Sequence, residues 1–153
     1  MPQTLNWSPE QDAENIREGA RDLQSELHRR VYDPNFDDPV AARRFLESPR
    51  TYWRRRALEK FELFQDRPIH GDVMEIGAGT GWCSAWLSRK PDVNKVYALE
   101  YDPYAVDHLM PKVFRQADAD VSKIVRVLGS FNHMPQVYGQ LDLVVSIGAI
   151  HHS

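Results

Sequence analysis

The hydrophobic positions of this chain change their pattern near residue 70. Before that point apolar residues recur three or four positions apart, and Ser-Pro or Asp-Pro pairs predict helices starting at residues 8, 38 and 48. After it come four short apolar runs, at residues 73–76, 95–100, 124–128 and 141–150. Short runs separated by helical or polar segments predict a parallel sheet with right-handed crossovers. The fold class is therefore expected to be α/β.

The third predicted helix carries Trp53, Ala57, Phe61 and Phe64 at helical spacing, so these residues share one face. We expect Trp53 to be buried in the core. The alternative is that Tyr52 and Trp53 cover a ligand pocket.

A glycine-rich segment follows the first apolar run. The run ends in Glu75 and opens into Gly77, Gly79 and Gly81, after which a helix can begin. Glycines permit positive φ and let a ligand approach the main chain, and the N–H groups of a helix start are weakly positive. A small polar ligand would suit this turn. A dinucleotide fingerprint would need a third glycine where this chain has Trp82.

This Glu-x-Gly-x-Gly-x-Gly pattern resembles the first motif of class I S-adenosylmethionine-dependent methyltransferases. Glu100 ends the second apolar run at about the 20-residue distance expected for an acid that binds ribose hydroxyls. Tyr101 could pack on an adenine ring. Asp102 and Pro103 have the character of an N-cap and a first helical residue.

The third apolar run leads into Gly129 and a polar turn. In the resembled family an acid commonly follows this glycine and binds the adenine amino group, whereas this chain has Ser130. Ser130 or Asn132 could replace that contact, and Phe131 could supply an apolar wall. An ordinary polar turn is the alternative.

The fourth run resembles the family's fourth strand and the start of its active-site loop, and it ends in His151 and His152. An imidazole titrates near neutrality, so either histidine could deprotonate an acceptor hydroxyl or amine. The alternative is that both are polar loop residues outside the reaction.

Four motifs in family order, over about residues 70–153, imply a Rossmann-like sheet with strand order 3-2-1-4. Residues 1–70 would form a helical extension or lid, and residues 71–153 an S-adenosylmethionine-binding core. The resemblance implies methyl transfer to an O, N or C atom of a small molecule. The cofactor-binding residues would be Glu75, Gly77, Ala78, Gly79, Gly81, Glu100, Tyr101, Ser130 and Phe131.

The implied sheet is incomplete, because the family's order continues beyond its fourth strand. We therefore expect a fragment of a longer enzyme, or a homo-oligomer or partner chain that covers the strand 4 edge, since exposed apolar edges pair with other chains. A cofactor-binding remnant or interaction module without turnover is a rival function, favoured by the incomplete sheet and Ser130. An NAD-dependent oxidoreductase is a second rival, and Trp82 weighs against it.

An arginine cluster precedes the first strand. It is either a solvated helix face, a site for an anionic substrate, or a site for RNA. The cluster is the only feature of the sequence that supports an RNA methyltransferase. Its members are Arg43, Arg44, Arg50, Arg54, Arg55 and Arg56.

The composition excludes several classes of protein and of partner. The 153 residues, 42% of them hydrophobic, can form a domain with its own core. A net charge of −3 does not favour a nucleic-acid partner. There is no apolar stretch of about 18 residues and no signal-peptide core, so we expect a cytoplasmic protein with no membrane partner. Cys83 is the single cysteine, which excludes an intrachain disulfide, and no metal site is expected.

Overall fold

The computed structural model describes the backbone of residues 3–6 and the whole of residues 35–131 and 141–149. A parallel sheet runs through it in the order β1-β4-β3-β2-β5. The strands are β1 (Gln3–Asn6), β2 (Gly71–Ile76), β3 (Val93–Glu100), β4 (Ile124–Leu128) and β5 (Leu143–Ser146). The last four strands have the predicted order 3-2-1-4, so the predicted fold class is confirmed.

Strand β1 lies beside β4 and was not predicted. Gln3 pairs with Val125 and Asn6 with Leu128, in parallel register. Residues before position 71 were expected to be helical, yet they also contribute a strand to the sheet of the core. Four residues without a long apolar alternation give no recognisable strand signal. The helix predicted from residue 8 lies outside the described residues.

Helices α3 (Pro39–Leu46) and α4 (Pro49–Gln65) begin where the sequence predicted. The Asp38 side chain accepts a hydrogen bond from the Val40 N–H at 2.9 Å, and the Ser48 hydroxyl accepts one from the Thr51 N–H at 3.3 Å. A capping side chain followed by proline satisfies free N–H groups and presets φ for the first turn.

The apolar face of α4 points away from the molecule. Trp53 is 68% exposed and Phe64 is 87% exposed, so the prediction that Trp53 is buried is wrong. The opposite side of α4 faces the protein instead, where Thr51 is buried and Leu58 packs against the core. Helical spacing shows which side chains share a face, but the direction of that face depends on tertiary contacts.

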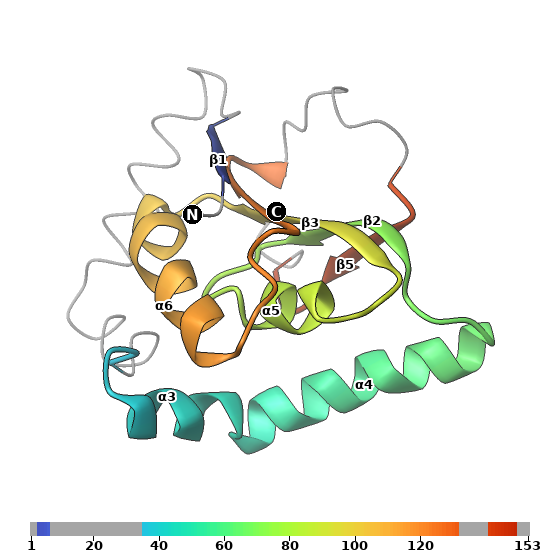
Figure 1. The fold of residues 1–153 in the computed structure, drawn as a ribbon, viewed down its shortest axis with the longest axis horizontal. Helices are drawn as coiled ribbons and strands as arrows, with labels where there is room; N and C mark the ends of the chain where they lie inside the picture. Colours follow the sequence, from blue (N-terminus) through green and yellow to red (C-terminus); the bar gives the residue numbers. More distant parts are fainter. Residues whose placement is uncertain (1–2, 7–34, 132–140, 150–153) are drawn as a thin grey trace.

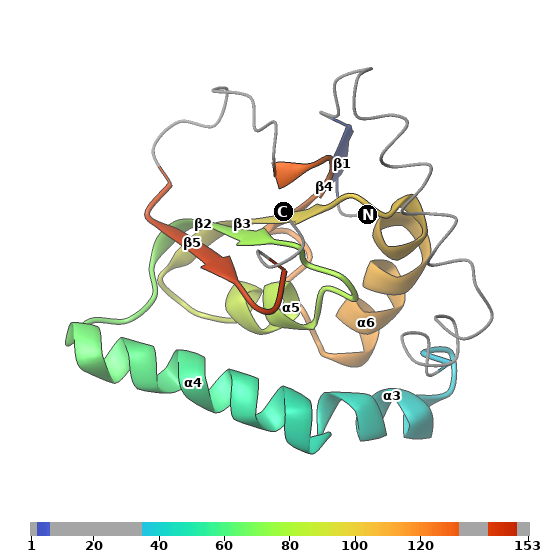
Figure 2. The same ribbon diagram turned by 180° about the vertical axis from the view of Figure 1, so that it is seen from behind.

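Three further helical segments cover one face of the sheet. They are α5 (Trp82–Ser88), a π-helical segment η2 (Ala105–Leu109) and α6 (Met110–Gln116). Helices α3 and α4 run end to end along the outside of this layer (Figures 1 and 2). The main core lies between α5, α6 and the sheet, with Val73, Val96, Leu87 and Val113 fully buried. None of the described helices is long and apolar enough to cross a membrane.

Candidate cofactor-binding site

The loop between β2 and α5 carries three glycines with left-handed backbone, at φ values of 67° for Gly77, 52° for Gly79 and 79° for Gly81. A methyl group added at Gly81 would lie 2.7 Å from the Phe114 ring, and one at Gly77 would overlap the Cβ of Ala149. A methyl group at Gly79 would meet no atom within 4 Å. Packing therefore requires two of the glycines, whereas Gly79 faces open space where a ligand can approach the main chain.

The main chain of this loop is anchored on the neighbouring strand. The Ala78 N–H donates to the carbonyl oxygen of Leu99 in β3 at 2.9 Å, and the Gly81 N–H donates to that of Ala78 at 2.8 Å. The Ala78 side chain is buried. Ala78 therefore contributes to the site through its backbone position.

Glu100 joins the glycine loop to the end of β3. One carboxylate oxygen accepts the Gly79 N–H at 2.7 Å, and the other accepts the N–H groups of Tyr101 and Asp102 at 2.9 and 3.1 Å. A carboxylate offers roughly four acceptor positions, so about one remains. The side chain is buried, and burial raises the pKa of Glu100 against the effect of these three hydrogen bonds. Glu100 can accept about one ribose hydroxyl, rather than the two of a diol.

Glu75 is a buried acid beneath the same loop. The Ser84 hydroxyl of α5 donates to its carboxylate at 2.5 Å. Burial raises the pKa of Glu75 to about 7, although the hydrogen bond from Ser84 lowers it. Cys83 is also fully buried, and burial and the nearby Glu75 charge raise the pKa of its thiol. Near neutral pH, Glu75 is therefore poised between its two forms, and a cation placed beside it would favour the charged form.

The segment after Glu100 starts the next helix as predicted. The Asp102 carboxylate accepts the N–H groups of Tyr104 and Ala105 at 2.9 and 3.2 Å. Tyr101 is 37% exposed and follows directly after Glu100 at the edge of the site.

The turn after β4 lies beside Glu100, because the Gly129 N–H donates to the Glu100 carbonyl oxygen at 3.0 Å. Ser130 and Phe131 are both half-buried. Phe131 packs against a small cluster on the sheet face opposite α5, formed by Met74, Ile76, Leu99 and Val127. Asn132 lies outside the described residues.

Two buried hydroxyl groups near the site have no hydrogen-bond partner among the described residues. One belongs to Thr80 in the glycine loop, and the other to Ser146, which pairs with Ile76 at the end of β5. Leaving a buried polar group unpaired costs about 1–3 kcal/mol, so such groups are candidates to bind a ligand. Sequence reasoning missed both residues, and the signal for Thr80 was its place between two motif glycines.

His151 and His152 lie outside the described residues, but the loop that leads to them is described through residue 149. A methyl group added at Gly148 would lie 3.2 Å from the Arg54 guanidinium of α4. One member of the arginine cluster thus reaches this loop. Other members make local ion pairs on the helix surface, such as Arg43 with Glu47 and Arg56 with Glu59.

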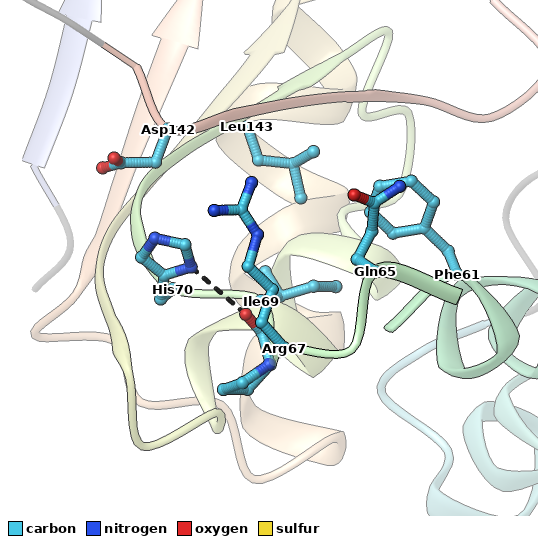
Figure 3. Close-up of a pocket in the computed structure, with 8 residues that line it drawn as sticks. Phe61, Gln65, Arg67, Ile69, His70, Asp142 and Leu143 are labelled. Atoms are coloured by element: carbon cyan, nitrogen blue, oxygen red, sulfur yellow. Dashed lines mark hydrogen bonds between the residues drawn. The ribbon is translucent and has the colours of Figure 1, made fainter. Parts of the chain in front are cut away.

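A small hollow at the other end of the sheet is unsuited to a cofactor (Figure 3). It lies where β2 and β5 begin and holds about 40 Å³, whereas ligand pockets hold roughly 300–1,000 Å³. Its wall includes His70, whose ring contacts the Pro68 carbonyl oxygen at 3.2 Å, and Asp142, which accepts the Asp72 N–H. Within the described part of the chain no three His, Cys, Asp or Glu side chains could hold a metal ion.

Comparison with known proteins points to one family. A family model described as a methyltransferase domain matches residues 73–153. No curated protein matches the chain. Among solved structures, the chain is similar to a putative S-adenosyl-L-methionine-dependent methyltransferase from Methanococcus maripaludis, with 18% sequence identity and a TM-score of 0.47. The match covers 95% of this chain and 54% of that one, so the chain spans about half the length of that protein.

Proposed function

The chain belongs to the methyltransferase domain family, and from this premise we propose that it binds S-adenosylmethionine at the glycine loop and transfers a methyl group to a small molecule. One observation carries the proposal. Gly79 has a left-handed backbone, faces open space and donates its N–H to the buried Glu100 carboxylate. The left-handed φ of Gly79 already favours glycine, and the open space beside it leaves the main chain accessible to a ligand.

The polar groups around Gly79 fit such a cofactor. Glu100 retains about one acceptor position for a ribose hydroxyl. The unpaired hydroxyl of Thr80 offers a further hydrogen bond from the same loop. Tyr101 would lie on the adenine face, and Ser130 and Phe131 would flank it.

Glu75 would stabilise the ammonium group of the cofactor, directly or through water. Its pKa of about 7 means that the free protein holds a proton there for part of the time near neutrality. Binding of a cation favours the ionised form, so cofactor binding is expected to release a proton and to strengthen as pH rises through 7.

When bound, S-adenosylmethionine supplies a methyl group that its sulfonium already activates. The protein then has mainly to align donor and acceptor and to remove the acceptor's proton. We assign that proton to an imidazole nitrogen of His151 or His152. Arg54 beside Gly148 would favour an acceptor that carries an anionic group.

A thermal-shift comparison tests this proposal against its rivals. S-Adenosylhomocysteine at about 100 times its Kd would stabilise the fold by about 2.7 kcal/mol, whereas NADH would leave the Tm unchanged. Stabilisation by NADH alone would support the oxidoreductase. If neither ligand acts on a folded sample, the chain is an inactive remnant or an interaction module.

A further inference from the structure

The outward side of α4 presents large apolar side chains. Phe64 is 87% exposed, Leu63 80% and Trp53 68%. Tyr52 and Phe61 are each just over 40% exposed. We name these five side chains the α4 outer face. Figures 1 and 2 show α4 on the rim of the molecule, with one long side turned to the sheet layer and the other turned away. With 3.6 residues per turn, Trp53 and Phe64 point within about 20° of each other, and the other three lie about 80–100° to either side, so the five side chains cover about half of the helix circumference. Exposed apolar surface of this extent marks interaction surfaces.

The same side of α4 carries positive charge. With 3.6 residues per turn, Lys60 falls within about 20° and Arg50 within about 60° of the Trp53 direction. Both cations are exposed, and neither makes an ion pair with a described residue. Arg56 also lies on this side and bonds to Glu59 at 2.5 Å.

The two carboxylates of α4 are occupied elsewhere. Glu62 points inward, where it accepts the Ile69 N–H at 2.9 Å and pairs with Lys90 at 2.8 Å. Glu59 pairs with its own helix neighbours Arg55 and Arg56. The α4 outer face therefore combines aromatic and apolar groups with cations, and both carboxylates within α4 are paired with described residues. Exposed Asp66 follows directly after the helix.

We propose that the α4 outer face binds an anionic lipid surface. Tryptophan and phenylalanine side chains enter the boundary between headgroups and acyl chains, and arginine and lysine are attracted to anionic headgroups. A second copy of the chain is a poorer occupant. An antiparallel α4 pair centred on Leu58 would bring Arg56 of each copy against Lys60 of the other, where the like charges repel.

Surface binding does not require a spanning segment. A helix that lies in the plane of the interface needs only one apolar side, so the inference agrees with the absence of a spanning helix among the described residues. It departs from the expectation of no membrane partner, which rested on the absence of a long apolar stretch and of a signal-peptide core. The net charge of −3 opposes binding only weakly, because charges farther than about 10 Å from the surface are screened.

Vesicle sedimentation of the 153-residue chain tests this inference independently of the cofactor site. With vesicles of equal parts phosphatidylserine and phosphatidylcholine, the bound fraction should exceed that with pure phosphatidylcholine by about tenfold, and salt should reduce it. The Trp53→Ser/Phe64→Ser variant should lose at least about tenfold in affinity. Both positions are exposed, so its melting temperature should stay near that of the wild type.

Charge reversal provides the matched comparison. Arg50→Glu/Lys60→Glu should abolish sedimentation, whereas Lys95→Glu/Arg115→Glu, an equal charge change at exposed sites outside α4, should retain most of it. Equal loss in both variants would overturn the inference, as would binding that ignores phosphatidylserine. A third result would also overturn the inference: the chain does not sediment with vesicles, and it forms a dimer that the Trp53→Ser/Phe64→Ser variant does not form. The α4 outer face would then be a contact between two copies of the chain.

Discussion

Replacing Glu100 with Gln tests the assignment of the residue that holds the glycine loop. An amide has one oxygen, which can keep the N–H groups of Tyr101 and Asp102. The amide nitrogen would then face the Gly79 N–H, so that donor meets donor where the carboxylate now accepts at 2.7 Å. Losing a hydrogen bond to a charged group costs about 1.5–3 kcal/mol.

Part of that cost is offset. Burial raises the pKa of Glu100, so the neutral side chain also avoids the penalty of burying a charge. We expect a net loss of about 1–2 kcal/mol in the free energy of unfolding, which corresponds to a drop of about 2–8 °C in Tm for a chain of this length.

The larger effect should fall on the cofactor. In Glu100→Gln the glycine loop is released, and the carboxylate oxygen that could accept a ribose hydroxyl becomes part of an amide. The variant should therefore bind S-adenosylhomocysteine at least about tenfold more weakly, which calorimetric titration would measure. Asp102→Asn is the matched control, because the two Asp102 oxygens each accept one N–H and the amide would likewise leave one N–H facing a donor. It should lower Tm by a similar amount but leave the affinity for S-adenosylhomocysteine nearly unchanged. Wild-type affinity in Glu100→Gln would refute the assignment.

Two further predictions concern the same loop. Gly79→Ala should weaken S-adenosylhomocysteine binding, and its cost in the free energy of unfolding should be only about 1–2 kcal/mol, for an alanine in a left-handed conformation. Gly81→Ala should lower Tm further, because its methyl group would press on the Phe114 ring. Equal melting temperatures and equal affinities in the two variants would contradict this. The Glu75 pKa of about 7 exceeds its ordinary value of 4.5, so the folded protein retains a proton that the unfolded chain has released between these pH values. The free energy of unfolding should therefore fall by about 3 kcal/mol as pH rises from about 4.5 through 7. Urea titrations at pH 5 and 8 should show a shallower fall in Glu75→Gln, and an unchanged slope would refute the shift.

Much of the fold could be predicted because local signals and tertiary structure agree in the second half of the chain. Apolar runs bounded by glycine, proline and capping residues gave the order of strands and helices from residue 71 onward. Asp38 and Ser48 marked helix starts because a side-chain cap followed by proline is a local signal. Strand β1 could not be predicted, because its four residues depend on β4 for hydrogen bonds.

The sequence predicted that Glu100 and the glycine loop lie together, which the Gly79–Glu100 hydrogen bond confirms, but it did not predict the detailed contacts of the candidate site. The spacing of Glu100 after the glycines identified an acid at the site, but its three backbone hydrogen bonds depend on how the loop folds back. Likewise, the Ser84 contact that supports Glu75 joins a strand to a helix and leaves no mark in the sequence. The prediction that Trp53 is buried was wrong for a similar reason, because periodicity does not show which side of a helix faces the core.

The central claim is that the glycine loop holds S-adenosylmethionine, and calorimetric titration of the 153-residue chain with S-adenosylhomocysteine tests it most directly. We predict saturable binding at one site per chain, weakened in Gly79→Ala and stronger at pH 8 than at pH 6 because Glu75 ionises between them. A folded sample that releases no heat and shows no thermal shift with the same ligand would contradict the account.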